Sequence, residues 1–392
     1  MGAAALHCDL LVVGSGAAGL AAAVTAAHHG LKVVLVEKDA VFGGATAWSG
    51  GWLWVPGNPL ARRAGIHEDP QQPRTYLRHA LGPRYDAERV DAFLDHAGAM
   101  VAFFEQHTAL QFVDGNAIPD MHQQLPGAAT QGHQVAAAPG ATERLALPPE
   151  ACAGDGITLG ESAGGVLQTD VASAGAWAPV SRVPHADGSV GHFPHIIDRG
   201  KPGLIGVLAD GRRFVNEADG YYDYTATMLA AVPPGQQVAS WLVCDHRFVR
   251  RYGLGHAKPF PLPLGPHLRS GYLQRGATIE ALATACRIDP AGLAATLRAF
   301  NAGARRGEDS AFGRGSSAYN RKQGDPLHGP NPCVVPIEHG PFYAVKVLPG
   351  SFGTFAGLKT NGRAQVLGAD GGPIAGLYAA GRLAPTPSPA AS

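Results

Sequence analysis

The chain has 392 residues, and its 31 Lys and Arg residues balance 31 Asp and Glu residues, which gives a formal net charge of zero. This length exceeds what one small core needs and predicts two or three domains. The balanced charge argues against nucleic acid as a partner, and no apolar run is long enough to form an integral membrane segment.

The cysteines, the histidines and the N-terminal residues lead to two further expectations. The five cysteines are scattered and the 17 histidines show no metal-binding spacing, so we expect no metal. Residues 1–7 lack the cationic region of a secretory signal. The cytoplasm is therefore the expected location.

The first expected elements are a buried parallel strand at residues 10–13, a glycine-rich turn and an alanine-rich helix at 20–29. Elements in this order make the phosphate-binding part of a dinucleotide site. The first glycine permits the turn, the second lets the backbone approach a pyrophosphate, and the third allows close packing of helix on strand. The phosphates would bind N–H groups at the start of the helix. The residues expected at the cofactor are Gly14, Gly16, Ala17, Ala18 and Gly19.

A second strand is predicted at residues 31–36, and Glu37 follows it directly. In dinucleotide sites an acid about 20 residues beyond the glycines accepts hydrogen bonds from the adenosine ribose. Such an acid also repels a 2′-phosphate, so the expected cofactor is FAD or NAD and not NADP. The alternative for Glu37 is an ordinary solvated strand end.

Residues 43–51 combine four glycines with small and hydroxylated side chains. Such a segment allows close backbone approach to an extended ligand and offers hydroxyl donors, although a flexible loop has the same composition. The residues expected along the ligand are Gly43, Gly44, Ala45, Thr46, Ser49, Gly50 and Gly51.

The stretch EKDAVFGGATAWSGGWLWVPGN, residues 37–58, resembles the second glycine motif of the fumarate reductase and 3-ketosteroid dehydrogenase family of flavoproteins. Its apolar end, residues 52–56, is more similar to the steroid dehydrogenase branch. The resemblance recurs along most of the chain. It implies FAD as cofactor, with Lys38 in the loop that passes the pyrophosphate. It also implies an α/β fold: a Rossmann-like FAD-binding domain, with a doubly wound parallel sheet, and an inserted α+β substrate cap domain.

Apolar residues at helical spacing predict helices at residues 74–81 and 87–106, and a short strand follows at 110–114. The next loop contains Met121. In the steroid dehydrogenases a loop resembling this one carries a tyrosine that helps the catalytic base, and Met121 stands near that place.

Residues 132–149 lead directly into 153–160, which resemble the family's threonine-Gly-Asp-Gly element. Relatives carry a long segment between these landmarks, so we infer an internal deletion of domain size. The doubly wound sheet should then lack a strand, which leaves apolar surface uncovered. By resemblance Asp155 is a candidate flavin contact; it is also a candidate N-cap for a helix at 157–164.

Residues 212–218 resemble the family's signature at the boundary between cap and flavin, and three tyrosines follow within a few positions. Dehydrogenation beside a ketone needs a base for the more acidic proton, a donor for the enolate, and flavin N5 as hydride acceptor. By its spacing from the signature Tyr221 matches the family's basic tyrosine, with Tyr222 as the alternative. Packing in a core or an interface would also explain these tyrosines.

The last part of the chain resembles the family's return to the nucleotide domain, with Gly357 and Leu358 in a flavin-adjacent turn and Gly381 in a final glycine turn. Relatives continue with a tyrosine-containing loop and a long helix that points at the flavin. This chain has an Ala/Pro/Ser-rich tail there, which we expect to be disordered. The expected boundaries are 1–165 for the first part of the FAD-binding domain, shortened near 132–152, 166–332 for the cap, 333–383 for the return and 384–392 for the tail.

These features predict an FAD-dependent oxidoreductase of the 3-ketosteroid dehydrogenase type, with a small steroid-like substrate and an electron acceptor that the sequence leaves open. A fumarate reductase-like dicarboxylate reductase is one alternative, with Arg199 or Arg314 as proton donor. A shortened, catalytically impaired flavoprotein remnant is another, because the loop and helix expected to be missing would stabilise the enolate and the reduced flavin. The sequence leaves the oligomeric state open.

Overall fold

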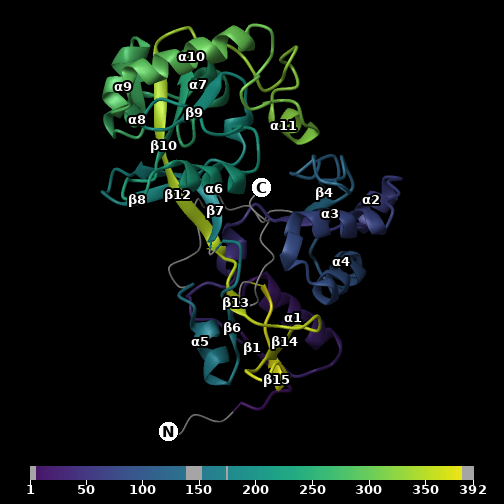
Figure 1. Ribbon diagram of the computed structural model, residues 1–392. Helices are drawn as coiled ribbons and strands as arrows, with labels where there is room; N and C mark the ends of the chain where they lie inside the picture. The colour runs from purple at the N-terminus through teal and green to yellow at the C-terminus, as the bar shows by residue number, and fades with distance from the viewer. Residues whose placement is uncertain (1–5, 138–151, 174, 382–392) are drawn as a thin grey trace.

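The computed structural model describes residues 6–137, 152–173 and 175–381 (Figure 1). The join predicted for the missing segment and the tail at 384–392 therefore lie largely or wholly outside the described residues. Figure 1 shows three parts: a part with α1 and β13–β15, a lateral part with α2–α4, and a sheet with helices above both. The predicted domain boundaries stay a prediction.

The N-terminal unit contains the predicted strand, turn, helix and strand. Strands β1 (Leu10–Val13) and β2 (Val33–Val36) pair in parallel and are joined by α1 (Ala17–His28), which begins earlier than expected. Among the described residues this parallel sheet has two strands, whereas a doubly wound sheet is covered on both faces. Leu11 is 57% exposed, and Val13 and Val36 are each 44% exposed. The uncovered apolar surface that the sequence predicts is present.

The described residues of the lateral part form three α-helices, one short 3-10 helix and a three-stranded antiparallel sheet. Buried side chains along its longest helix include Val90, Ala97 and Val101, which confirms the predicted amphipathic pattern. Ala97 and Val101 pack in one core with Val55, Leu60 and Val135. The elements are β3 (Trp52–Trp54), α2 (Pro59–Arg63), α3 (Gln71–Leu81), η2 (Gly82–Arg84), α4 (Ala87–His107), β4 (Phe112–Asp114) and β5 (Gln134–Ala137), with strand order β3-β5-β4.

The largest sheet has the strand order β8-β7-β12-β10-β9, with β11 also paired to β12, and all its pairs are antiparallel. Alternate residues of its central strands enter two different cores, since successive side chains of a strand point to opposite faces. Leu242 belongs to one core and Val243 to the other. The strands are β7 (Gly175–Pro184), β8 (Val190–Pro194), β9 (Leu204–Val207), β10 (Ser240–Asp245), β11 (Gln274–Gly276) and β12 (Phe342–Thr354).

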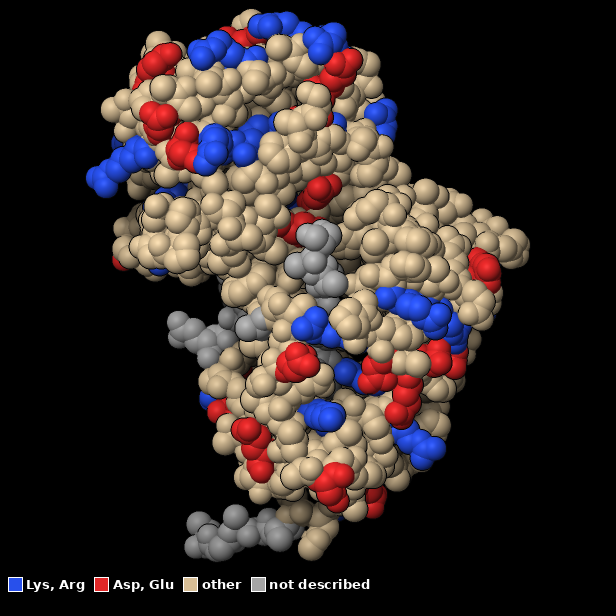
Figure 2. Space-filling view, viewed as in Figure 1, with Lys and Arg blue, Asp and Glu red and all other residues tan. Residues whose placement is uncertain are grey.

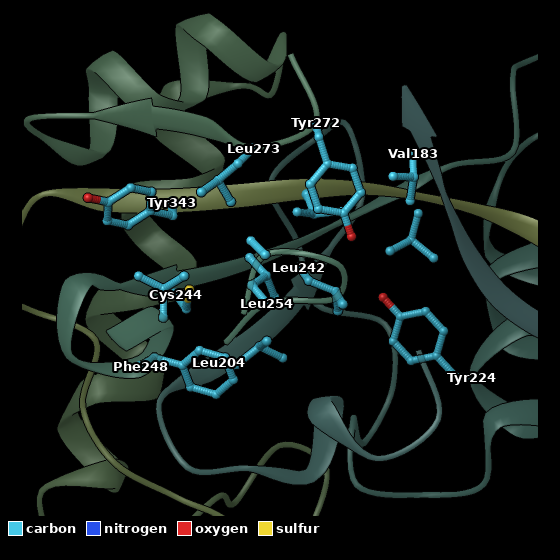
Figure 3. Close-up of a cluster of buried hydrophobic side chains, with 14 of the residues drawn as sticks. Val183, Leu204, Tyr224, Leu242, Cys244, Phe248, Leu254, Tyr272, Leu273 and Tyr343 are labelled. Atoms are coloured by element: carbon cyan, nitrogen blue, oxygen red, sulfur yellow. The ribbon is translucent and has the colours of Figure 1, made fainter. Parts of the chain in front are cut away.

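Helices cover both faces of this sheet. One core packs against α9 (Ile279–Cys286) and α10 (Pro290–Ala304). The other core holds three tyrosines, and in Figure 3 the hydroxyls of Tyr224 and Tyr272 point into the cluster. Ser240 and Ser181 are their hydrogen-bond partners. The remaining helices of this part are η3 (Asp198–Gly200), α6 (Tyr221–Ala231), α7 (His246–Tyr252), α8 (Gly265–Arg269) and α11 (Ala318–Gln323).

The C-terminal segment runs from β12 back to the N-terminal unit (Figure 1). Its short strands pair as β13 with β6 and β14 with β15, and a small core of Leu358, Val366 and Ala379 lies between them. The C-terminal strands are β13 (Gly357–Leu358), β14 (Gln365–Leu367) and β15 (Pro373–Tyr378). Three elements from earlier in the chain complete the list: η1 (Gly44–Trp48), α5 (Asp155–Ser162) and β6 (Leu167–Gln168).

Charged side chains of both signs are interspersed on the face shown in Figure 2. Within the described ranges no helix is long and apolar enough to cross a membrane. The same residues contain no group of three or more His, Cys, Asp or Glu side chains placed to hold a metal, and all five cysteines are free thiols.

A buried ion network joins the segment before α6 to the segment between α10 and α11. Arg213 binds the carboxylates of Glu217 at 2.6 Å and Asp309 at 2.8 Å, and Arg314 binds Glu217 at 3.2 Å. The side chain of Glu217 is fully buried. Although burial opposes ionisation, Arg213 and Arg314 hold the pKa of Glu217 below its usual value.

We predict that Glu217→Gln lowers the free energy of unfolding by about 3–5 kcal/mol at neutral pH, because it leaves buried arginines without their carboxylate. The folded-state pKa of Glu217 lies below the unfolded value. The stabilisation is therefore present near neutral pH and is lost as the pH falls through the folded pKa. Urea unfolding at several pH values measures both effects.

Asp210→Asn is the matched control, because the Asp210–Arg212 pair is exposed, with side-chain exposures of 43% and 78%. It should cost less than about 1 kcal/mol. Equal losses from the two substitutions would contradict the assigned role of Glu217.

Candidate active site

The turn between β1 and α1 has the geometry of a phosphate cradle. Gly14 adopts a φ of +95°, which favours glycine. A Cβ on Gly19 would lie 2.0 Å from the Gly14 carbonyl oxygen, so this position requires glycine for close packing. Gly16 is the N-cap of α1, with no side-chain cap and no acid in the first turn. The first-turn N–H groups of a helix have no partner within the helix, and such groups are what the pyrophosphate of FAD would require.

The carboxylate of Glu37 holds this turn in place. It accepts hydrogen bonds from the Asp39 N–H at 3.0 Å and from the Ser15 N–H at 2.8 Å, and also from the Ser15 hydroxyl. The bonds from Asp39 and Ser15 lower the pKa of Glu37 to about 2. Glu37 is therefore an anion at neutral pH, as an acceptor for ribose hydroxyls must be. The ribose contact itself stays a prediction.

The second glycine segment lies directly against the first. The Gly43 N–H donates to the Ser15 hydroxyl at 2.9 Å, and the Ala17 N–H donates to the Thr46 hydroxyl at 3.0 Å. A Cβ on Gly44 would lie 3.5 Å from the Cα of Gly16. The structure thus brings the two predicted glycine motifs together around the start of α1.

The other predicted cofactor residues take different positions. The Ser49 hydroxyl donates to the Thr46 carbonyl at 2.8 Å, so its proton is used inside the loop. Gly381 reaches the cradle, since a Cβ there would lie 3.0 Å from that of Ala18. The Leu358 side chain is buried against α5 and serves as a core residue. Ala45 lies within η1. Gly50 and Gly51 lie between η1 and β3, and Gly357 is the first residue of β13.

Lys38 and Asp155 form an exposed ion pair at 2.7 Å. The pair joins the segment after β2 to α5, although the two residues are far apart in sequence. Gly154 is the N-cap of this helix and Asp155 its first residue, so the alternative role of Asp155 as N-cap was wrong. Glycine precedes the helix there with a φ of +88°.

The predicted catalytic tyrosines lie at the start of α6. Helix α6 begins at Tyr221, whose ring lies 5.5 Å from that of Phe352, and Tyr222 lies 6.0 Å from Phe355. These phenylalanines directly precede the turn that contains Gly357. Both tyrosines are half-buried, whereas Tyr224 is fully buried and belongs to the core.

Arg199 holds the backbone segment that directly precedes α6. Its buried guanidinium donates to the carbonyls of Glu217 at 2.8 Å and Asp219 at 3.2 Å, and it lies 4.9 Å from the Tyr224 ring centre. Arg314 donates to Glu217 and to backbone carbonyls, including that of Arg199. Both arginines are 1% exposed. Their guanidinium groups bind the backbone and Glu217 beside α6 and are not available to a substrate.

Burial, and then the negative charge of Asp223, raise the pKa of Tyr221. Two further tyrosines, Tyr76 of α3 and Tyr319 of α11, interact electrostatically with Asp223. Burial also raises the pKa of each. Sequence reasoning missed both, because the two tyrosines are far from Asp223 in the sequence and the fold brings them near it.

The loop after β4 lies beside the start of α6. A Cβ on Gly220 would lie 3.5 Å from the Met121 sulfur, so Met121 stands beside the start of α6. The neighbouring His122 lies 4.0 Å from Asp223. Asp120 anchors the loop, because its carboxylate accepts hydrogen bonds from Trp54 at 2.7 Å and from the Ala129 N–H at 2.8 Å.

Comparison with known proteins agrees with this geometry. The family described as "FAD binding domain" matches residues 9–142 and 126–388. The chain is 31% identical to a 4-oxocyclohex-2-ene-1-carboxylate 5-dehydrogenase of Sinomonas cyclohexanicum, over 97% of this chain and 89% of that protein. It is 28% identical to a 3-oxosteroid 1-dehydrogenase of Mycobacterium tuberculosis, over 96% and 92%.

A solved structure shows the same fold. The crystal structure of 3-ketosteroid delta1-dehydrogenase from Sterolibacterium denitrificans, in complex with 1,4-androstadiene-3,17-dione, matches with a TM-score of 0.88 and 24% identity. The match covers 96% of this chain and 94% of that one. The predicted fold class, an FAD-binding α/β fold with a cap, is confirmed, and so is the family resemblance.

The lengths also bear on the inferred deletion. The alignment to the Sinomonas protein extends over 526 residues, whereas this chain has 392. The relative therefore contains long stretches without a counterpart here. This difference supports the inference that the chain lacks a segment found in its relatives.

We predict opposite outcomes for alanine at two glycines of the cradle. Gly19→Ala should lower the free energy of unfolding by roughly 1–3 kcal/mol, because its methyl group overlaps the Gly14 carbonyl. Gly16→Ala should leave unfolding almost unchanged, since the nearest atom to its Cβ is 3.9 Å away. It should instead weaken FAD binding by about tenfold or more, which corresponds to a loss of at least about 1.4 kcal/mol of binding free energy.

Urea unfolding of the cofactor-free chain and fluorescence titration with FAD separate these effects. If the Gly16→Ala variant binds FAD as tightly as the wild type, the pyrophosphate does not lie on this turn.

Proposed function

The chain belongs to the FAD binding domain family, and we propose that it is an FAD-dependent dehydrogenase acting beside the ketone of a cyclic, ketosteroid-like substrate. The observation that carries this proposal is the position of Tyr221. It stands at the start of α6, held through Arg199, against the phenylalanine that precedes the predicted flavin-adjacent turn.

Bound FAD would supply the hydride acceptor of the reaction. Residues around the turn after β1, together with Glu37 and the 43–51 segment, would hold the nucleotide part. The Tyr221 phenolate would take the proton from the carbon next to the ketone and become the neutral phenol, with Tyr222 as the alternative base. The phenolate becomes more populated as the pH rises, and because burial and Asp223 raise the pKa of Tyr221, activity should rise towards alkaline pH.

The surroundings of Tyr221 favour a ring ketone as substrate. Apolar and aromatic side chains gather there, and the two relatives described above are both named as dehydrogenases of ring ketones. Phe352 and Tyr319 lie near Tyr221, and Met121 lies beside the preceding Gly220. An apolar ring system fits such a site better than a small dianion does.

The dicarboxylate reductase alternative receives less support. It would use an arginine as proton donor, but Arg199 and Arg314 are buried and bound to carbonyls or to Glu217. The impaired-remnant alternative draws its support from the exposed apolar residues of β1 and β2. Flavin retention and turnover decide between it and the dehydrogenase.

We predict that Tyr221→Phe reduces turnover of a 3-ketosteroid by about a hundred- to ten-thousand-fold, because it removes the proton acceptor. Turnover is measured with an artificial electron acceptor, and the flavin absorbance shows that the cofactor is retained. Tyr222→Phe tests the alternative base.

Tyr224→Phe is the matched control on the same helix, since the Tyr224 hydroxyl binds Ser240 inside the core. Its effect should fall on stability and not on turnover. Full activity of both Tyr221→Phe and Tyr222→Phe would overturn the assignment of a tyrosine base.

A further inference from the structure

The chain from α7 through α8 to β11 is strongly basic, although the whole protein has a formal net charge of zero. Residues 246–279, called here the basic segment, contain six Lys and Arg residues and no Asp or Glu. The six residues are Arg247, Arg250, Arg251, Lys258, Arg269 and Arg275. The residues assigned above to FAD and to catalysis all lie outside the basic segment.

The guanidinium groups at α7 face solvent, whereas the carboxylates that pair with two of them are buried. Arg247 pairs with Asp245, and the two side chains are 53% and 3% exposed. Arg251 pairs with Asp325, and these side chains are 55% and 9% exposed. An arginine side chain keeps its charge across the physiological pH range. A partner that approaches this surface therefore meets guanidinium groups and not carboxylates.

Exposed apolar side chains stand in the middle of the basic segment. Phe260 is 72% exposed and Leu262 is 52% exposed. One exposed apolar residue is ordinary in a globular protein, but a group of them with a charged rim indicates an interaction site. A third member, Leu327, is 86% exposed, and its N–H donates to Asp325, the carboxylate that pairs with Arg251. The three side chains thus lie close to the end of α7.

Contacts with Arg250 hold the loop that carries Phe260 and Leu262. The Phe260 N–H donates to the Arg250 carbonyl at 2.9 Å, and the Arg250 guanidinium donates to the Leu262 carbonyl at 2.9 Å. The same guanidinium lies 4.9 Å from the centre of the Phe260 ring. Prolines at 259, 261 and 263 restrict the backbone further. The loop is therefore ordered before it meets a partner, which lowers the entropic cost of binding.

From these contacts we propose that the basic segment, with Leu327, docks on the surface of a lipid bilayer that contains anionic phospholipids. Arginine and lysine side chains are attracted to anionic headgroups. Phenylalanine and leucine side chains enter the boundary between headgroups and acyl chains. A nucleic acid or an acidic peptide would neutralise the charges but offers no apolar layer to Leu262 and Leu327. The bilayer surface satisfies both features.

Co-sedimentation of the full chain, with FAD added, with lipid vesicles tests the proposal. We expect at least about tenfold tighter binding to vesicles of phosphatidylcholine and phosphatidylglycerol in equal amounts than to vesicles of phosphatidylcholine alone. Added salt should weaken this binding, because salt screens exposed charges. The assay contains no ring ketone, so its result does not depend on the proposed function.

Two variants separate the attraction of charges from the insertion of apolar side chains. Lys258→Glu reverses an exposed charge and should weaken binding to the anionic vesicles by about tenfold. Phe260→Ser combined with Leu262→Ser removes the apolar area that the bilayer would bury, and we expect a loss of about tenfold or more. The matched controls are Leu159→Ser on α5, where the leucine is 54% exposed, and Arg363→Glu, an exposed charge before β14. Neither control should weaken binding.

Tighter binding to the anionic vesicles that both variants weaken, and that both controls preserve, supports the proposal. Equal binding to the two kinds of vesicle would overturn it, and so would binding that the double variant leaves unchanged. If neither vesicle binds and the chain sediments as a dimer that the double variant dissociates, the surface belongs to a second copy and the proposal is wrong. Should the double variant fail to fold, Leu262→Ser alone gives the same test, because Arg250 binds the backbone of Leu262 and not its side chain.

Discussion

The placement of the candidate site depends on one buried carboxylate. Glu217 binds Arg213, Arg314 and the Gly206 N–H of β9 through its side chain, and it accepts a hydrogen bond from Arg199 through its backbone carbonyl. A buried charge is tolerated only with such partners. The same contacts fix the chain just before α6. The position of Tyr221 is thus a consequence of how the protein neutralises Glu217.

A second constraint acts at the cofactor cradle. Gly43 donates to Ser15, and Ser15 donates to Glu37, so one chain of hydrogen bonds joins the second glycine segment to the turn after β1 and to the end of β2. This arrangement persists although the parallel sheet has two strands among the described residues and exposes apolar side chains. Local hydrogen bonds can therefore preserve the cradle where the wider sheet is reduced.

Much of the cofactor cradle could be predicted from the sequence, because the contacts that determine it are local. The glycine spacing gave the strand, turn and helix, and a clash at Gly19 explains why its residue type is restricted. His122 and Arg199 could not be assigned in the same way, because their places beside α6 arise from contacts between residues that are far apart in the sequence. Asp155 shows the opposite error: its residue type fits an N-cap, but Gly154 takes that position and Asp155 pairs with Lys38.

We expect this chain, which is shorter than its relatives, still to bind FAD at the start of α1. An absorbance spectrum of the purified chain, recorded after FAD has been added and the excess removed, tests this expectation. A flavin band that is stoichiometric with the chain is expected. Folded, soluble protein without a flavin band would contradict it, and the dehydrogenase chemistry would then describe the relatives and not this chain.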